Sequence, residues 1–164
     1  MKNRKQPVIH IIDKNSSYRK VIEGFVRVLG ISKVSSSECC EELLSGKIHP
    51  DIIILDQLMG EDKITGLDFL RTYASSHFPD TRFIFLSSST SLDIAVDSIR
   101  TGAYDYIVKS KSGLERLVKR LDNLVNAYQL SYRKKIQLRT AAISLGMFSI
   151  LFALIIYLYN HQAF

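Results

Sequence analysis

The last part of this sequence has no charged side chains. Residues 140–164 contain no Lys, Arg, Asp or Glu, and the preceding segment Tyr128–Arg139 contains no acid. At the other end we expect no signal peptide, because Asp13 interrupts the short apolar run Val8–Ile12. The sequence also has no internal repeat and no low-complexity tract. These absences indicate a globular chain with one unusual, uncharged segment.

Cysteine is also scarce. The two cysteines, Cys39 and Cys40, are neighbours in the sequence. Adjacent cysteines are poorly placed to bridge each other, and unpaired cysteines are typical of a reducing compartment. We therefore expect no disulfide and no chemical role for either thiol.

Positive charge is concentrated in one short segment. The net charge is +6, and four of these charges come from Arg133, Lys134, Lys135 and Arg139, which leaves +2 for the first 127 residues. Nucleic-acid binding favours a clustered basic face on a recognisable reading motif. So mild a charge on the body of the chain predicts no nucleic-acid partner.

The uncharged segment is long enough to cross a membrane. Ala141–Tyr159 has 19 residues without a charge, and a helix of that length spans roughly 28 Å, close to the hydrocarbon core of about 30 Å. Tyr157 and Tyr159 lie at its far end, where interfacial aromatic residues are common. Basic residues lie only before it, so the positive-inside rule predicts a cytoplasmic body and a tail, Asn160–Phe164, on the other side. A buried core helix is the alternative, but too little sequence follows to cover one.

Strand and helix patterns alternate through the first 127 residues. Five strand-and-helix units in about 125 residues indicate a doubly wound α/β fold with a five-stranded parallel sheet. We expect the strands at Pro7–Asp13, Ile31–Ser35, Asp51–Asp56, Thr81–Ser87 and Tyr104–Lys109. We expect the helices at Tyr18–Leu29, Ser37–Leu44, Gly66–Ser75 and Leu92–Arg100, and from Ser112 to about Tyr159.

Asp56 is the first candidate site residue. It follows four apolar residues, a pattern typical of a strand buried on both faces of a parallel sheet. Ligands of open α/β sheets bind at the carboxyl edge of the strands. A carboxylate is costly to bury, so an acid at this edge indicates a functional group.

Five features in register resemble the response-regulator receiver domain of two-component signalling. An acid follows the first strand (Asp13), another ends the third (Asp56), Met59 comes three residues later, and Ser87 ends the fourth strand. The most specific block is Gly-Ala-Tyr-Asp-Tyr-Ile-Val-Lys at 102–109, which places Tyr106 and Lys109 at the family's switch and lysine positions. The resemblance covers residues 7–127 and implies a flavodoxin-like sheet of order 2-1-3-4-5.

The resemblance implies a phosphorelay function without enzymatic output. Asp56 would accept a phosphoryl group from a histidine kinase or phosphotransfer protein. Mg²⁺ would be held by Asp13, Asp56 and the backbone carbonyl of Leu58. Lys109 would pair with the phosphoryl oxygens as a point charge, while Ser87 would donate its hydroxyl and Tyr106 would follow it inward. The family also implies a bacterial inner membrane for the anchor.

Lys14 departs from the family pattern, which has a second acid at that position. A cation about 4 Å from the site is worth on the order of 4 kcal/mol at an effective dielectric of 20, so an inward Lys14 would weaken Mg²⁺ binding or neutralise Asp56. Alternatively, Lys14 points to solvent and Asp13 binds alone. Smaller departures are Met59-Gly60 with a late Gly66, and Ser110 in place of a proline.

The last helix predicts how the domain is anchored. We divide the chain into a receiver domain (1–127), a basic helical linker (128–140), a transmembrane helix (141–159) and a tail (160–164). A seam of small residues of the kind that packs membrane helices is formed by Ala142, Gly146, Ser149 and Ala153. It predicts a homodimer or a membrane partner.

Three functions stay open at this point. The first is a membrane-anchored receiver that is phosphorylated at Asp56 and signals by protein contact. The second is a phosphorylation-independent pseudo-receiver that serves as a scaffold or subunit of a membrane complex. The third, a hydrolase with Asp56 as nucleophile, is disfavoured because Leu58 stands where a second catalytic acid would be needed.

Overall fold

The structure is a computed structural model that describes residues 6–46, 48–58 and 64–161. The chain divides into two compact units, Gln6–Val125 and a second that contains the residues from Asn126 onward. The long helix α5 (Lys111–His161) contributes to both units.

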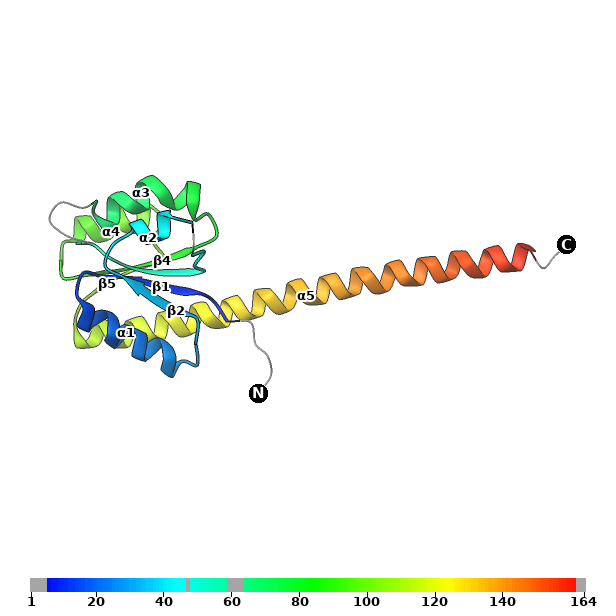
Figure 1. The fold of residues 1–164 in the computed structure, drawn as a ribbon, viewed down its shortest axis with the longest axis horizontal. Coiled ribbons are helices and arrows are strands. Elements are labelled where there is room, and N and C mark those ends of the chain that lie inside the picture. The colour runs from blue at the N-terminus through cyan, green and yellow to red at the C-terminus, as the bar shows by residue number, and fades with distance from the viewer. Residues whose placement is uncertain (1–5, 47, 59–63, 162–164) are drawn as a thin grey trace. The chain divides into compact units, whose positions relative to one another are not determined.

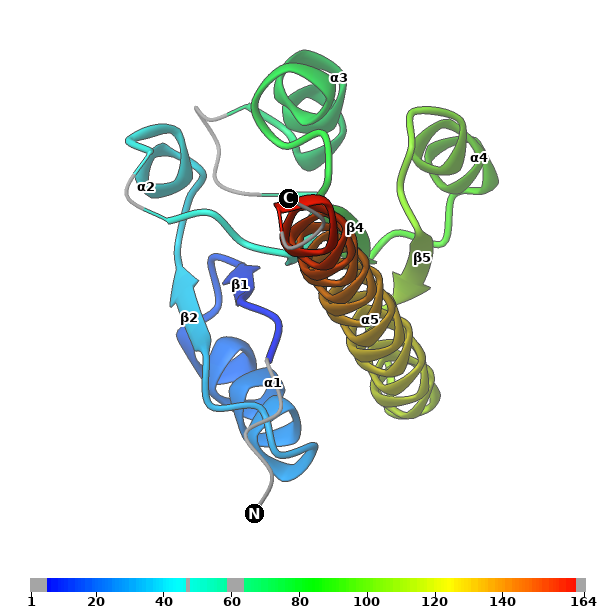
Figure 2. The same ribbon diagram turned by 90° about the vertical axis from the view of Figure 1, so that its right-hand side faces the viewer.

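The first unit is built on a five-stranded parallel sheet of order β2-β1-β3-β4-β5, which confirms the predicted sheet. Figures 1 and 2 show α1 and the first part of α5 on one face and α2, α3 and α4 on the other. The strands are β1 (Ile9–Ile12), β2 (Val34–Ser37), β3 (Ile52–Asp56), β4 (Arg82–Ser87) and β5 (Asp105–Val108). The first four helices are α1 (Ser16–Val28), α2 (Glu41–Leu44), α3 (Gly66–His77) and α4 (Leu92–Arg100).

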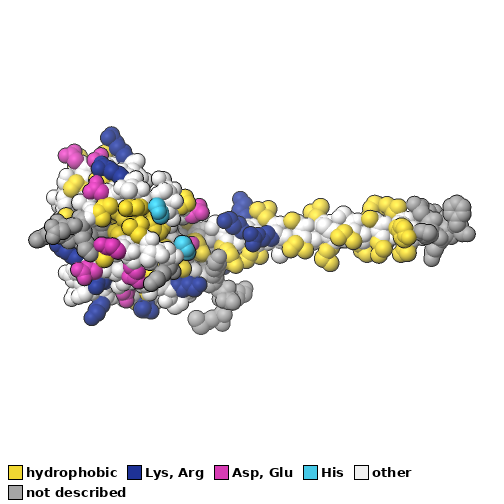
Figure 3. Space-filling view, turned by 45° about the horizontal axis from the view of Figure 1, so that its top comes forward, with side chains coloured by type: hydrophobic (Ala, Val, Ile, Leu, Met, Phe, Trp, Pro, Cys, Tyr) yellow, Lys and Arg dark blue, Asp and Glu magenta, His cyan; other side chains and the backbone are white. Residues whose placement is uncertain are grey.

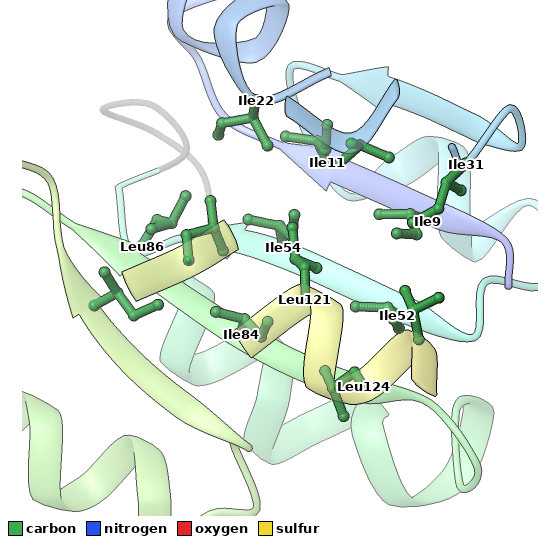
Figure 4. Close-up of a cluster of buried hydrophobic side chains, with 14 residues drawn as sticks. Ile9, Ile11, Ile22, Ile31, Ile52, Ile54, Ile84, Leu86, Leu121 and Leu124 are labelled. Carbon is green, nitrogen blue, oxygen red and sulfur yellow. The ribbon is translucent and has the colours of Figure 1, made fainter. Parts of the chain in front are cut away.

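Each strand sends alternate side chains to the two faces of the sheet, and this alternation produces two buried clusters. On one face, Ile52 and Ile54 pack against Leu121 and Leu124 of α5, as Figure 4 shows. On the other face, Ile53 and Leu55 belong to a cluster that includes residues of α2 and α3. Because β3 is buried on both faces, its polar end residue is held in a fixed place.

The second strand lies later in the sequence than predicted. The strand and the helix are present, but the predicted bounds Ile31–Ser35 and Ser37–Leu44 are wrong: β2 is Val34–Ser37 and α2 is only Glu41–Leu44. Ile31 is buried in the core as the chain leaves α1, and does not pair in the sheet. The serine-rich segment pairs with β1 instead. The side chains of Ser35 and Ser37 each lie within 2.8 Å of a ring nitrogen of the buried His10, which supports this pairing.

Side-chain caps fix the first turns of the two helices that begin beside the strand ends. The carboxamide oxygen of Asn15 accepts a hydrogen bond from the backbone N–H of Tyr18 in α1. The hydroxyl of Thr65 accepts one from the N–H of Asp68 in α3. Such caps satisfy backbone donors that a helix start leaves unpaired. They therefore set the direction in which each loop leaves the sheet.

The described part of the second unit is helical and exposed. All residues from Arg133 to Leu158 are exposed, and an 18-residue window of α5 has a mean hydropathy of 2.4 with none of it buried. By length and composition this is the one helix among the described residues that could cross a membrane. Figure 3 shows a group of Lys and Arg side chains on this helix, followed by hydrophobic ones. In the predicted seam, the Ser149 hydroxyl donates to the Gly146 carbonyl of the same helix.

Candidate functional site

The carboxyl ends of neighbouring strands bring four predicted site residues to one edge of the sheet. Asp13 directly follows β1 and Asp56 ends β3, and these strands pair in register with Ile12 opposite Leu55. Ser87 ends β4, and Lys109 follows β5, where its backbone N–H donates to the Ser87 carbonyl at 2.8 Å. The parallel topology alone explains why residues so far apart in sequence meet here.

Lys109 lies between the two carboxylates. Its Nζ atom is 2.7 Å from Oδ2 of Asp13 and 2.8 Å from Oδ2 of Asp56. The Asp13 and Asp56 side chains are 2% and 5% exposed, and the Lys109 side chain is 15% exposed. Buried charges are tolerated when they are paired. The ammonium is therefore the counter-ion of both acids in this structure.

The pKa values of the pair follow from burial and mutual charge. Burial raises the pKa of Asp56, and the negative charge of Asp13 adds to this, although Lys109 and a hydrogen bond from the Leu58 backbone oppose the shift. Burial alone would lower the pKa of Lys109, but its hydrogen bonds to both carboxylates outweigh burial and the pKa is raised. The lysine is therefore firmly cationic.

The other two predicted site residues, Ser87 and Tyr106, contact the segment that follows β4. Ser87 is buried, and its hydroxyl oxygen accepts a hydrogen bond from the Ser89 backbone N–H at 3.0 Å. Tyr106 is also buried: its ring stacks on Phe85 and its hydroxyl donates to the Ser89 carbonyl at 2.8 Å. Both hydroxyls thus contact the backbone of Ser89, in the segment that follows β4.

The side chain of Lys14 is exposed. Of the two predicted orientations, the structure therefore supports the outward one, and Lys109 is the cation that neutralises Asp56. The backbone of Leu58 lies at the site through its hydrogen bond to the Asp56 carboxylate. Among the other departures, Met59 and Gly60 lie outside the described residues, whereas Gly66 starts α3 and Ser110 directly precedes α5.

Helix α1 contributes residues that the sequence did not indicate. The Tyr18 ring lies beside Lys109, with 5.1 Å from its centroid to the ammonium nitrogen. Asp13 is held by two hydrogen bonds. The Asn15 backbone N–H donates to its carboxylate, and the Arg19 guanidinium donates to its backbone carbonyl. In the sequence, Tyr18 is simply the first apolar residue of the expected helix Tyr18–Leu29. Nothing in that pattern connected it with the site.

The donor set fits a Mg²⁺ site. No group of three His, Cys, Asp or Glu side chains suited to a metal is present among residues 6–46, 48–58 and 64–161. However, two carboxylate oxygens lie within 2.8 Å of one cationic atom, Nζ of Lys109, so a small cation could reach both after the lysine moves away. Mg²⁺ is often held by one or two carboxylates, with waters completing its shell.

Comparison with known families identifies the domain. The model of the response regulator receiver domain matches residues 9–122. The chain belongs to the response regulator receiver domain family. Its receiver domain is of the kind found in two-component response regulators, and receiver domains of this family generally bind Mg²⁺ at the phosphorylation site.

Curated relatives are longer proteins with a similar receiver region. The luminescence regulatory protein LuxO of Vibrio campbellii is 31% identical over 101 residues, which cover 60% of this chain and 21% of LuxO. The regulatory protein AtoC of Escherichia coli is 29% identical over 103 residues, which cover 62% and 22%. The chain thus spans about a fifth of the length of these relatives.

Solved receiver domains have the same fold. The signal receiver domain of a LuxO repressor protein from Vibrio parahaemolyticus aligns with a TM-score of 0.67 and 20% identity, over 77% of this chain and 95% of that one. A CheY-like receiver domain from Methanospirillum hungatei aligns with a TM-score of 0.65 and 18% identity, over 75% and 96%. At these identities the likeness establishes the fold.

Proposed function

We propose that this chain is a membrane-anchored receiver domain that accepts a phosphoryl group at Asp56 and signals by protein contact. The observation that carries the proposal is the Lys109 ammonium, which lies within 2.8 Å of both Asp56 and Asp13 at the carboxyl edge of the sheet. The donor would be a histidine kinase or a phosphotransfer protein. Such a transfer requires an ionised carboxylate with a nearby cation, and this edge holds both.

In the proposed reaction, one oxygen of the ionised Asp56 attacks the phosphorus of a phosphohistidine. The P–O bond forms as the P–N bond breaks, and the imidazole leaves with a proton from solvent. Lys109 pairs with the phosphoryl oxygens after the transfer, and the Ser87 hydroxyl turns from Ser89 to donate to the same group. Asp13, Asp56 and the Leu58 carbonyl would hold Mg²⁺, whose positive charge would offset the crowded anions.

The experiment is a mass measurement on the purified chain in detergent. With Mg²⁺ and acetyl phosphate, or with a phosphorylated histidine kinase, we expect a mass gain of about 80 Da from one phosphoryl group. The Asp56→Asn variant should show no gain. Phosphorylation that survives in Asp56→Asn would contradict the assignment of Asp56 as acceptor.

A second candidate, a phosphorylation-independent pseudo-receiver, is favoured by one observation. The Lys109 ammonium already pairs with both carboxylates, in a domain where Lys14 stands at the position of another acid in the family. The domain would then act as a scaffold or subunit of a membrane complex. If the wild-type chain gains no mass but Lys14→Asp does, this second function replaces the first.

The anchoring part of the proposal rests on α5. Its uncharged stretch 141–159 would form a single transmembrane helix after a basic linker (128–140), with the receiver domain (1–127) in the cytoplasm and residues 160–164 beyond the membrane. The exposure of this stretch and its mean hydropathy support the proposal. The seam of Ala142, Gly146, Ser149 and Ala153 would pair two copies or bind a membrane partner. Crosslinking in membranes that yields only monomer, with any partner present, would exclude that pairing.

A further inference from the structure

The Tyr18 side chain forms a third side of the environment of Lys109. Two sides are the carboxylates of Asp13 and Asp56, and the ring centroid lies 5.1 Å from the same ammonium nitrogen. An aromatic face within about 6 Å attracts a cation, and the attraction grows when the cation is desolvated. The Lys109 side chain is only 15% exposed, so this contact is shielded from water.

The position of Tyr18 is set by the loop that carries Asp13. The backbone N–H of Asn15 donates to the Asp13 carboxylate at 2.8 Å, and the side chain of Asn15 in turn caps the N–H of Tyr18 at 3.1 Å. Tyr18 is thus one helical turn from the residue that ties the loop to the site. Any displacement of the Asp13 loop would displace the ring as well.

The hydroxyl of Tyr18 does not explain why a tyrosine stands here. This oxygen is buried and has no hydrogen-bond partner among the described residues. The ring also packs against the buried cluster that contains Ile52 and Leu121. A purely structural role would therefore need only an apolar side chain of similar size. The ring and the hydroxyl can therefore be separated by substitution.

We propose that Tyr18 is a positioning residue, which holds the Lys109 ammonium against Asp13 and Asp56 and so sets how readily a divalent cation replaces it there. This inference deepens the proposed function and rests on it for the use of Mg²⁺. A cation that approaches Asp13 and Asp56 must displace the ammonium. Loss of the aromatic face removes one of the three contacts that oppose this displacement.

The test compares Tyr18→Leu with Tyr18→Phe in the full chain in detergent. Leu removes the aromatic face, whereas Phe keeps the ring and removes only the hydroxyl. The first readout is the mobility of the Lys109 side chain, measured by NMR relaxation at its Cε without metal. The second is the dissociation constant for Mg²⁺, measured from the backbone amide shifts of Gln57 and Leu58.

We expect Tyr18→Leu to increase Lys109 mobility and to lower the Mg²⁺ dissociation constant by about 3-fold to about 30-fold. Tyr18→Phe should match the wild type within about twofold in the same measurement. If Tyr18 had only a structural role, Tyr18→Leu would change neither the Lys109 mobility nor the Mg²⁺ dissociation constant relative to Tyr18→Phe. Unchanged far-UV circular dichroism shows that both variants fold normally.

Three results would overturn the inference. One is a Lys109 mobility in Tyr18→Leu equal to that of the wild type. The second is a Tyr18→Phe variant that behaves like Tyr18→Leu, because the hydroxyl would then carry the effect. The third is greater Lys109 mobility in Tyr18→Leu without tighter Mg²⁺ binding. Failure of the proposed function is distinct: Asp56 would gain no phosphoryl group, while the effect of Tyr18 on Lys109 mobility would remain.

Discussion

The ammonium of Lys109 and the carboxylate of Asp56 form a buried ion pair with 2.8 Å between Nζ and Oδ2. Asp13 shares the same ammonium at 2.7 Å. Removal of one partner from a buried pair leaves the other charge without compensation, which is strongly destabilising. In this site the removal of Lys109 would leave two such acids side by side.

We therefore expect Lys109→Gln to lower the free energy of unfolding by about 3 kcal/mol at neutral pH. Added Mg²⁺ should restore much of this loss, because a divalent cation can take the place of the ammonium between Asp13 and Asp56. Urea denaturation of the chain with and without Mg²⁺ measures both effects. The matched control is Lys119→Gln, an exposed lysine of α5, which should change stability by less than about 0.5 kcal/mol. A Lys109→Gln variant as stable as this control would contradict the prediction.

His10 predicts a loss of stability on acidification. Its ring is fully buried in β1, and burial lowers its pKa although the charge of Glu42 opposes the shift. The unfolded chain binds the proton at about pH 6.5, whereas the folded chain binds it only at a lower pH. The stability due to neutral His10 is therefore present above about pH 6.5 and is lost as the pH falls towards the folded pKa.

The measurement is the free energy of unfolding between pH 7.5 and pH 5.5, a window that spans the ordinary histidine pKa of about 6.5. His10→Gln should lose most of the wild-type slope in this window, because Gln does not titrate. His49→Gln, which replaces an exposed histidine, is measured beside it as the reference variant. An identical slope in the wild type and in His10→Gln would show that other groups cause the acid sensitivity.

Topology determines where the site lies in this domain, whereas local geometry determines how its side chains are directed. A continuous apolar run such as Ile52–Leu55 is typical of a strand buried on both faces of a parallel sheet. The residue that ends such a strand lies at the carboxyl edge of the sheet, so the position of Asp56 was predictable. The resemblance to the receiver family implied that Lys109 belongs to the same site, but it implied a contact with phosphoryl oxygens, and the ion pair with Asp56 was not predicted.

Other features depend on side-chain directions that a periodic pattern does not contain. The edge strand β2 has three serines and no apolar alternation to mark it, and two of them, Ser35 and Ser37, contact His10. The outward direction of Lys14 and the inward direction of Tyr18 depend on the Asn15 cap at the start of α1. A helical pattern gives the face of a residue, and it does not show that an aromatic ring ends beside an ammonium.

The start of α3 has room only for a glycine, which is Gly66. A Cβ atom there would overlap the carbonyl oxygen of Asp56 and lie 3.1 Å from the Phe85 ring. The backbone N–H of Gly66 also donates to the Gln57 carbonyl at 3.0 Å. The start of α3 therefore cannot move away without the loss of that hydrogen bond. We expect Gly66→Ala to destabilise the domain by about 2 kcal/mol and to slow phosphorylation of Asp56.

The matched control is Gly24→Ala. Gly24 lies inside α1, and a Cβ atom there would meet nothing within 4 Å. Alanine should stabilise this helix by about 0.5 to 1 kcal/mol. Thermal unfolding and the rate of mass gain from acetyl phosphate measure both variants. Equal effects of the two substitutions would mean that α3 can shift away from the end of β3.

The orientation of the proposed membrane span can be tested through the charges that precede it. The basic residues of the linker carry four positive charges close to the uncharged stretch 141–159, and no acid lies among them. Positive charges near a span keep their side in the cytoplasm. Alkaline phosphatase fused after Phe164, which is active only outside the cytoplasm, should therefore be active in a bacterial host.

The substitution of the four linker residues by Glu should reduce that activity strongly, because no positive charge would then hold the linker inside. The residues are Arg133, Lys134, Lys135 and Arg139. The control replaces Lys20 and Arg27, two exposed cations of α1, by Glu and should leave the activity unchanged, because orientation depends on charges close to the span. If alkaline carbonate releases the wild-type chain from membranes, the helix is not inserted. The uncharged stretch would then bury its apolar surface against a protein partner, since exposed apolar area of this extent marks an interaction surface.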